Sequence, residues 1–338
     1  MIKQKKIHQV VLVLMPCLIW LVLLKVNTPW WLENTLSTPL VLLVILLILL
    51  LFITKYVSKL QAAAYFIINL CLALFINNIQ ISDDGNINLE KIAYGCNNSL
   101  KFFQFNMKFN SNEDDIDKLT AYLIKENFEL ITLQGVPQQS KKPLIEKLNY
   151  YYPFYIIGEN KQKRLITDQI VFSLHAFENV NYHEIKSGSP LISSDWLIPR
   201  TDSDKIGELR TINLYTLHPP SPRNKKLWET RNTVLNQLNE AIKKQKVIHE
   251  NHKKTIVMGD LNLPRHSERI DDIKNLMHTK HINSWPNHTY LSTWFGLAID
   301  HFWISKSAYI CSRKRVDMFY GSDHYAIKTR VFIDNINI

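Results

Sequence analysis

The sequence lacks the cysteine pattern of an ordinary zinc site. It holds four cysteines in 338 residues, with no CxxC pair and no cluster of histidines and cysteines. Cys17 and Cys71 lie inside apolar runs, where a cysteine serves as a small packing residue. The chain also has no stripe of alternating aromatic and basic residues, which disfavours binding of single-stranded nucleic acid.

Acidic residues are almost absent from the first quarter of the chain. Six of the 40 basic residues and one of the 30 acidic residues precede residue 78, which leaves 34 basic and 29 acidic residues in the remainder. This mild positive excess would help a polyanionic substrate approach. A solvated basic face is the commoner explanation of such an excess.

Three apolar segments fill that first quarter, at about residues 9–26, 38–54 and 60–77. Each approaches the roughly 17 to 25 residues that a transmembrane helix needs, so residues 1–77 are predicted to be a membrane anchor. A cleaved signal peptide is the alternative for the first segment, but no small-x-small cleavage site follows it. The third segment would also suit an interfacial or buried helix.

The distribution of lysines predicts the orientation of this anchor. Lysines precede the first segment and separate the second from the third, whereas the loop at residues 27–37 holds Glu33 and no basic residue. The positive-inside rule therefore predicts a cytoplasmic N-terminus. Three spans would place the C-terminal domain outside the cytoplasm, on the periplasmic side, and two spans would reverse that.

A linker rich in Asn, Asp and Gly is predicted at residues 78–99, followed by one polar domain at residues 100–338. Apolar residues at helical spacing predict helices at about 114–126 and 226–244. Short apolar runs predict strands at 101–109, 128–133, 169–174, 208–217, 255–258, 298–305 and 325–333. Strands interleaved with helices indicate an α/β layered fold.

Polar residues with catalytic potential stand at the ends of these strands. Gly259-Asp260-Leu261-Asn262 follows the strand at 255–258, and alternate side chains of a strand point to one side. GDxN alone also suits a plain turn. The other strand ends carry Asn106, His218, Asp300 and the stretch Gly321-Ser322-Asp323-His324.

The order of these motifs resembles the endonuclease/exonuclease/phosphatase superfamily, the fold of DNase I, over about residues 100–335. It is most similar to the bacterial integral-membrane members, in which transmembrane helices precede the domain. The motifs that carry the resemblance are His218-Pro219-Pro220, Gly259 to Asn262, Pro264-Arg265-His266-Ser267 and Gly321 to His324, of which the third has one residue more than the family's P-x-S. The resemblance implies a four-layer α/β sandwich preceded by transmembrane helices.

The resemblance also implies catalytic roles for five residues. His324 would be the general base, with Asp300 orienting its imidazole. Asp260 and Asn262 would position the attacking water and the phosphate. His218 would hold a phosphate oxygen or assist the leaving group. The glutamate that usually pairs with this histidine has no clear counterpart, and Glu159 is the candidate.

Metal ligation is the part of the resemblance that this sequence departs from. Asn106 and Asp323 would lie at a divalent metal, Mg²⁺ or Mn²⁺. The principal metal ligand of the family is a glutamate in an L-Q-E stretch, and this chain has Leu133-Gln134-Gly135. Metal binding is therefore expected to be weakened. Gly135→Glu is expected to restore it, provided that the backbone there accepts a side chain.

Three functions remain open. The first is a membrane-anchored, metal-dependent phosphodiesterase or phosphatase that acts outside the cytoplasm on a lipid headgroup or another envelope phosphoester. The second is a pseudoenzyme that binds a phosphorylated ligand or a protein partner, because of Gly135. The third is a nuclease, which the mild basic charge favours and the membrane tether disfavours.

Two cysteines flank the domain. Cys96 precedes the first strand and Cys311 comes shortly before the last one. The terminal strands lie close together in the fold that the resemblance implies, so a disulfide between them is geometrically possible in an oxidising compartment. Two unpaired buried thiols are the alternative.

Overall fold

The computed structural model describes residues 29–36, 39–78, 96–97, 99–160, 165–184, 191–199, 208–248, 254–265, 267–287, 296–317 and 321–333. The first predicted membrane segment and most of the predicted linker lie outside these residues. The second and third segments are helical, as α3 (Pro39–Ile53) and α4 (Lys59–Asn78), which follow the short helix α2 (Trp30–Leu36). Within the described residues, no helix has both the length and the apolarity to cross a membrane.

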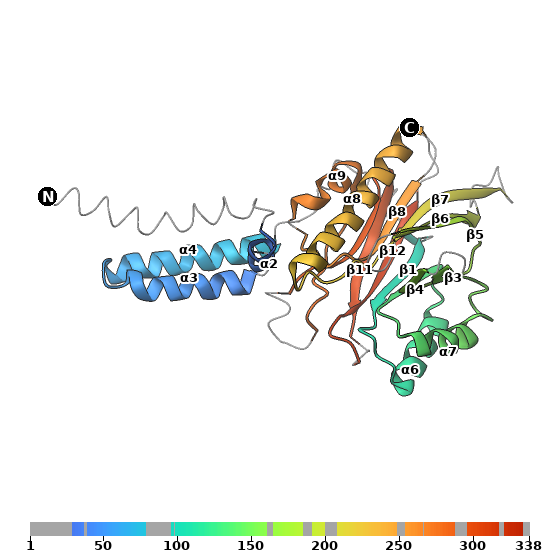
Figure 1. Cartoon of the computed structure of the whole chain (residues 1–338), viewed down its shortest axis with the longest axis horizontal. Helices are drawn as coiled ribbons and strands as arrows, with labels where there is room; N and C mark the ends of the chain where they lie inside the picture. The colour runs from blue at the N-terminus through green and yellow to red at the C-terminus, as the bar shows by residue number, and fades with distance from the viewer. Residues whose placement is uncertain are drawn as a thin grey trace.

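Two six-stranded sheets form the body of the molecule, beside the hairpin of α3 and α4 (Figure 1). The first sheet has the order β11-β12-β1-β2-β4-β3, and the second has the order β5-β6-β7-β8-β10-β9. The strands of the first sheet are β1 (Leu100–Asn106), β2 (Leu130–Gln134), β3 (Phe154–Asn160), β4 (Leu165–Ser173), β11 (Ala308–Val316) and β12 (Ala326–Ile333). Those of the second are β5 (Phe177–His183), β6 (Leu191–Pro199), β7 (Leu209–Thr216), β8 (Lys254–Asp260), β9 (Met277–His278) and β10 (Asp300–Ser305).

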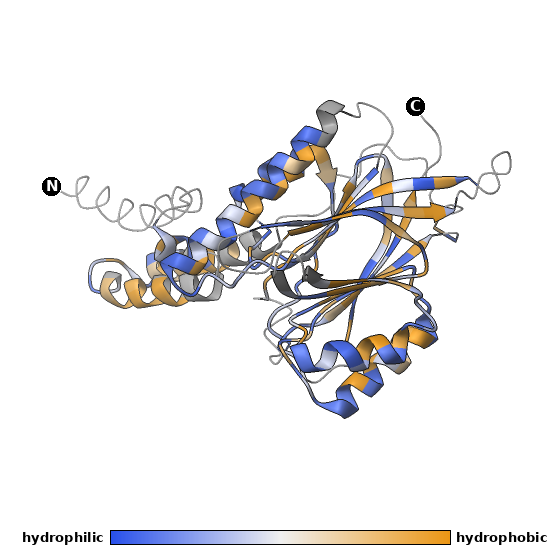
Figure 2. Cartoon of the chain, turned by 45° about the vertical axis from the view of Figure 1, so that its right-hand side comes forward, coloured by the Kyte–Doolittle hydropathy of each residue, from blue (hydrophilic) through white to orange (hydrophobic). Residues whose placement is uncertain are grey.

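Helices cover the outer face of each sheet. The first sheet carries α6 (Glu113–Glu126) and α7 (Gln138–Leu148), and the second carries α8 (Lys225–Ile248), a 3-10 turn at Glu268–Ile270 and α9 (Asp271–Leu276). These helices turn their apolar residues toward the sheets (Figure 2). The two mixed sheets and their helices form the layered α/β sandwich that the sequence predicts.

Successive residues of the central strands enter different cores, because side chains alternate between the faces of a sheet. On β1, Phe102 packs between the two sheets, whereas Phe103 packs under α6 and α7. On β8, Ile256 lies between the sheets and Val257 packs against α8. Both faces of these strands are buried, which explains their nearly continuous apolar runs.

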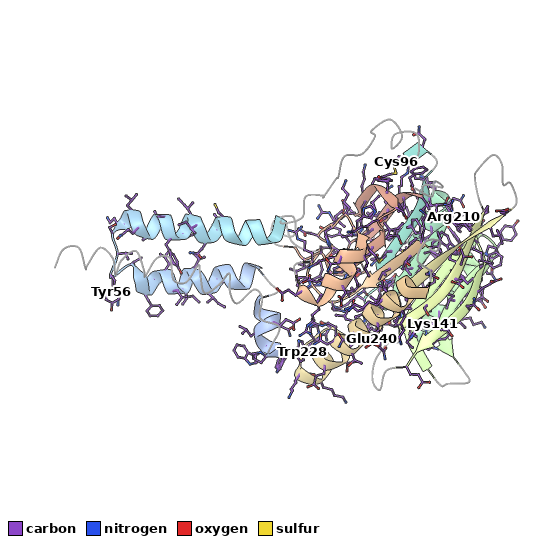
Figure 3. The ribbon with its side chains drawn as sticks, turned by 90° about the horizontal axis from the view of Figure 1, so that it is seen from above. Tyr56, Cys96, Lys141, Arg210, Trp228 and Glu240 are labelled. Carbon is purple, nitrogen blue, oxygen red and sulfur yellow. A yellow bond between two sulfur atoms is a disulfide. The ribbon has the colours of Figure 1, made fainter. Side chains whose placement is uncertain are left out.

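Two long-range links connect segments that precede β1 to the domain. Cys96 and Cys311 form a disulfide with 5.6 Å between their Cα atoms, so the pairing predicted as possible is present (Figure 3). Cys311 lies within β11, where the pairing with β12 shifts register between Ile310 and Ser312. Nearer the N-terminus, Glu33 of α2 is buried against α8, where its carboxylate accepts a hydrogen bond of 2.6 Å from the Trp228 indole (Figure 3).

Candidate functional site

The topology brings the carboxyl ends of β1, β2, β7 and β8 and the start of β10 to one edge of the sandwich. β1 and β2 are parallel, with Asn106 opposite Gln134, so both end at the same level. β7 and β8 are also parallel, which places the residues after β7 near Asp260 at the end of β8. β10 runs antiparallel to β8 and begins with Asp300 opposite Asp260. Polar groups that are distant in sequence therefore meet at this edge.

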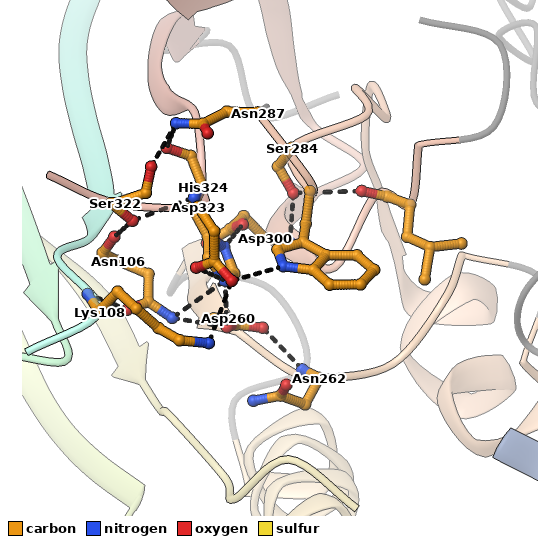
Figure 4. A network of polar contacts seen from close by, with 12 residues as sticks. Asn106, Lys108, Asp260, Asn262, Ser284, Asn287, Asp300, Ser322, Asp323 and His324 are labelled. Carbon is orange, nitrogen blue, oxygen red and sulfur yellow. Dashed lines mark hydrogen bonds and ion pairs between the residues drawn. The ribbon is translucent and has the colours of Figure 1, made fainter. Parts of the chain in front are cut away.

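His324 and Asp300 form the central pair of the site (Figure 4). The imidazole Nδ1 lies 2.8 Å from Asp300 Oδ2, and Nε2 lies 3.7 Å from Asp260 Oδ2. All three side chains are buried. Ser322 fixes the backbone here, because its hydroxyl accepts a hydrogen bond from His324 N–H and donates one to the carbonyl of Asn106.

His218 forms a second histidine–carboxylate pair beside Asp260. Its Nδ1 lies 2.9 Å from Asp168 Oδ2, and its Nε2 lies 3.7 Å from Asp260 Oδ2. Asn106 joins the two histidines, because its Nδ2 donates to Asp260 Oδ2 at 2.8 Å and lies 3.4 Å from the Nε2 atom of each ring. Asp260 is thus the centre of the cluster.

The GDLN turn positions Asp260 through close backbone contacts. A side chain at Gly259 would place its Cβ 1.9 Å from the carbonyl oxygen of Leu217, so only glycine allows β8 to approach β7 this closely. The sequence suggested that Asp260 and Asn262 lie on one strand with their side chains on the same side. The structure differs, because β8 ends at Asp260 and Asn262 has a φ of +48°. Asn262 N–H donates to Asp260 Oδ1 at 2.8 Å, and the Asn262 amide donates to the carbonyl of Pro219 at 3.0 Å.

Neighbouring charges shift the pKa values of these groups. Burial acts to lower the pKa of His324, but the charges of Asp300 and Asp260 raise it to about 9. Burial likewise acts to lower the pKa of His218, but the charge of Asp168 and the hydrogen bond between the two side chains raise it. Burial and the charge of Asp300 raise the pKa of Asp260. His324 is therefore an imidazolium at neutral pH, which favours an anionic ligand.

The acid at Asp323 is paired with an ammonium group. Its Oδ2 lies 3.2 Å from Lys108 Nζ and accepts a hydrogen bond of 3.0 Å from the Trp285 indole. The bond from Trp285 and the charges of His324 and Lys108 hold the pKa of Asp323 below its ordinary value, although burial opposes this. Asp323 is thus a carboxylate with a cation already beside it.

The residues at the predicted metal position do not fit Mg²⁺ well. Asn106 Oδ1 accepts a hydrogen bond from Lys108 N–H at 2.9 Å, Asp323 faces the ammonium of Lys108, and Gly135 supplies no ligand. A cation this close to the carboxylate opposes a second one. The buried group of Asp260, Asp300 and His324, whose ligand atoms lie within 4.8 Å of one another, could hold a metal instead.

The structure brings together all seven predicted site residues, which are Asn106, His218, Asp260, Asn262, Asp300, Asp323 and His324. Sequence reasoning missed Asp168, the partner of His218; an acid within the apolar strand β4 was the available signal. The side chain of Glu159, the earlier candidate, lies outside the described residues. Lys108 was also missed, because the strand predicted at 101–109 included it, whereas β1 ends at Asn106 and Lys108 lies in the turn that follows.

Comparison with known proteins agrees with this geometry. Residues 96–324 match the sequence profile of the Endonuclease/Exonuclease/phosphatase family. No protein with a curated description matches the sequence significantly.

Solved structures share the fold at low sequence identity. A protein of unknown function from Enterococcus faecalis V583 has a TM-score of 0.53 at 14% identity, over 70% of this chain and all of that one. The mannosyl-6-phosphatase Bt3783 of Bacteroides thetaiotaomicron has a TM-score of 0.51 at 15% identity, over 69% and 99%. A beta toxin mutant from Staphylococcus aureus with bound magnesium ions has a TM-score of 0.50 at 13% identity, over 70% and 100%.

Proposed function

Because the chain belongs to the endonuclease/exonuclease/phosphatase family, we propose that it hydrolyses phosphoester bonds at the cluster around Asp260. One observation carries this proposal. Two histidine–carboxylate pairs, the buried His324 with Asp300 and the partly buried His218 with Asp168, each place a ring Nε2 atom 3.7 Å from the same oxygen of Asp260. Such a pair fixes the tautomer of a histidine and stabilises its charged form, which acid–base chemistry requires.

The two histidines suit different steps of hydrolysis. His324, once it has lost its proton, accepts a proton from the attacking water, and the resulting imidazolium is stabilised by Asp300. His218 is charged more readily than an ordinary histidine, so its imidazolium can hold a phosphate oxygen or give a proton to the leaving alkoxide as the P–O bond breaks. Asn262, whose backbone N–H donates to Asp260 Oδ1, would orient the water or the phosphate.

A phosphate-binding module is the second candidate. It is favoured by one observation, which is that Lys108 and Gly135 stand where the resemblance implies metal chemistry. A site that retains cationic groups but lacks a metal would bind a phosphorylated ligand without turning it over. The presence or absence of turnover separates the two candidates.

A panel of phosphoesters tests the proposal directly. Full-length protein should release product from at least one phosphate monoester or diester, with phospholipid headgroups and nucleic acid included and assays run with Mg²⁺, with Mn²⁺ and in EDTA. His324→Ala should remove the activity, and His175→Ala, a histidine at the opposite end of β4, should leave it unchanged. A folded wild-type protein that hydrolyses nothing on this panel would leave the binding module as the function.

We also propose that the N-terminal segments attach the domain to a membrane, with the domain on the periplasmic side. The apolar composition of residues 9–26, 38–54 and 60–77 supports attachment. The disulfide supports an oxidising compartment. Glu33, in the loop between the first two segments, contacts Arg231 of the domain, which supports this loop and the domain lying on one side. Three spans satisfy that condition, and a second span without the third does not.

Protease treatment of intact spheroplasts tests this location. The domain should be digested without lysis, because it lies outside the cytoplasm. Digestion only after lysis would show that the domain is cytoplasmic. The substrate would then not be an envelope phosphoester.

A further inference from the structure

The turn after β1 delivers a lysine to the site. Lys108 and Phe109 have φ values of +52° and +58°, which turn the chain back toward the end of β2. Lys108 N–H donates to Asn106 Oδ1 at 2.9 Å, and Phe109 N–H donates to the carbonyl of Gly135 at 2.7 Å. This backbone conformation is uncommon for residues other than glycine, asparagine and aspartate, so the surrounding contacts must hold it.

Gly135 is the residue that leaves space for this turn. Its φ is +59°, and a Cβ there would lie 2.5 Å from Asn106 Oδ1 and 2.9 Å from the backbone nitrogen of Lys108. A glutamate at this position would therefore displace the turn that carries Lys108. The glycine in place of a carboxylate and the position of the lysine are therefore two parts of one arrangement.

The ammonium of Lys108 can exchange its partner. The Lys108 side chain is 41% exposed and that of Asp323 is 25% exposed, and an ion pair of this kind stabilises a fold only weakly. Asp323 keeps the hydrogen bond from Trp285 when the lysine leaves. Lysine is a point charge on a flexible stem and commonly binds phosphate in that role.

We propose that Lys108 is the resident phosphate-binding cation of this site and takes the place of a divalent metal ion. A phosphate bound near Asp260 would be held by Lys108 on one side and by His218 and His324 on the other. This phosphate site coincides with the site of the proposed hydrolysis, on which it rests, but phosphate binding there does not require that an ester is hydrolysed. The ligand is a phosphate group, bound without Mg²⁺ or Mn²⁺.

Calorimetric titration with inorganic phosphate tests the proposal on the full-length protein. Phosphate should bind equally well in EDTA and in Mg²⁺. Lys108→Met should weaken its binding at least about tenfold, and Lys108→Arg should retain most of it. Lys118→Met, an exposed lysine on α6, is the matched control and should bind as wild type does. Circular dichroism and thermal unfolding establish that each variant folds.

Mn²⁺ binding, followed by electron paramagnetic resonance, gives a second measurement. Wild type should show no Mn²⁺ site in the micromolar range, because a metal ion at Asp260, Asp300 and His324 would have to break the pair of His324 with Asp300. Tight Mn²⁺ binding together with phosphate binding that requires it, or unchanged phosphate affinity in folded Lys108→Met, would overturn the proposal.

The two proposals of function and binding can fail separately. Metal-free, lysine-dependent phosphate binding without hydrolysis of any ester would support Lys108 as the cation and reject the enzyme. Mg²⁺-dependent hydrolysis that is insensitive to Lys108→Met would support the enzyme and reject Lys108.

Discussion

The protonation of His324 sets how the proposed hydrolysis depends on pH. With a pKa of about 9, only about one imidazole in a hundred is neutral at pH 7. If His324 is the general base, log(kcat/KM) for a diester substrate should rise by about one unit per pH unit and level off near pH 9. Steady-state rates between pH 6 and 10 measure this.

Asp300→Asn tests the cause of that pH dependence. Removing the negative charge that stabilises the imidazolium should lower the pKa of His324, so the rising limb should move to lower pH even as the maximum rate falls. A wild-type rate that falls through pH 9 would mean that the imidazolium is the required form. His324 would then act on the phosphate and not on the water.

Reversing the charge at Lys108 should convert the proposed phosphate-binding site into a metal-binding site. Lys108→Asp would place a second carboxylate beside Asp323, and aspartate tolerates the positive φ of this position better than most residues. We expect this variant to gain Mn²⁺ binding, measured by paramagnetic resonance, and to lose metal-free phosphate binding. Lys108→Asn, which is neutral, is the control. No gain of Mn²⁺ binding in folded Lys108→Asp would show that the lysine is not what opposes the metal.

At the residue scale, the sequence predicted groups that follow recognisable motifs. Asp260, Asn262 and His324 belong to GDLN and GSDH, whose order is specific even though each is common. Asp168 has no motif, and its pairing with His218 depends on β4 lying beside β2 in the sheet. Sequence spacing alone cannot reveal such a partner, because 50 residues separate the two.

At the scale of elements, buried central strands were predictable and edge elements were not. The strands β7, β8 and β12 were predicted close to their observed bounds, since most of their residues are buried. The strand at 101–109 was predicted too long, because β1 ends at Asn106. β5 lies at a sheet edge and is mostly exposed, and β11, at the other sheet's edge, carries three basic residues. Such strands lack the apolar run that sequence reasoning depends on. The helix α7 was not predicted, because Pro143 inside it is a helix-breaking residue in sequence reasoning.

The turn that links β1 to β2 should be sensitive to any side chain at Gly135. Gly135→Ala adds a Cβ at a positive φ and against Asn106, so we expect the free energy of unfolding to fall by about 2 kcal/mol. Gly135→Asn separates the two causes, because asparagine tolerates positive φ but keeps the Cβ. Equal losses, measured by chemical denaturation, would assign the cost to the contact. No loss in either variant would contradict this account of the turn. Gly135→Glu is therefore a poor way to restore a metal ligand.

At the scale of the whole molecule, the disulfide closes a long stretch of chain. It joins Cys96, before β1, to Cys311 on β11 across 215 residues. Cys96→Ser with Cys311→Ser should lower the free energy of unfolding by about 2 to 5 kcal/mol, because the unfolded chain regains freedom. Thermal unfolding with and without reductant measures this. Two free thiols in protein from its native compartment, found by mass mapping, would contradict the bond.

A second whole-molecule link joins α2, through Glu33, to the edge of the sandwich that carries Asp260. Its carboxylate lies 2.6 Å from Arg231 Nη2 and 2.8 Å from Arg269 Nη2. Burial would raise the pKa of Glu33, but the hydrogen bond from Arg269 and the charge of Arg231 hold it below its ordinary value. Arg231 Nη1 also donates to the carbonyl of Asn262 at 3.1 Å. The segment before α3 is therefore connected to the GDLN turn through one arginine.

Glu33→Ala should uncouple this link, because it leaves the buried Arg231 without its carboxylate. Breaking a buried pair costs about 3 to 5 kcal/mol, so the unfolding temperature of the full-length protein should fall by several degrees. Glu229→Ala, an exposed acid on α8, should change it little. The double variant Glu33→Ala/Arg231→Ala should lose less than the sum of the single variants, since one interaction is removed in both. Strictly additive losses would show that the carboxylate and the guanidinium stabilise the fold independently, and that α2 does not hold the GDLN turn.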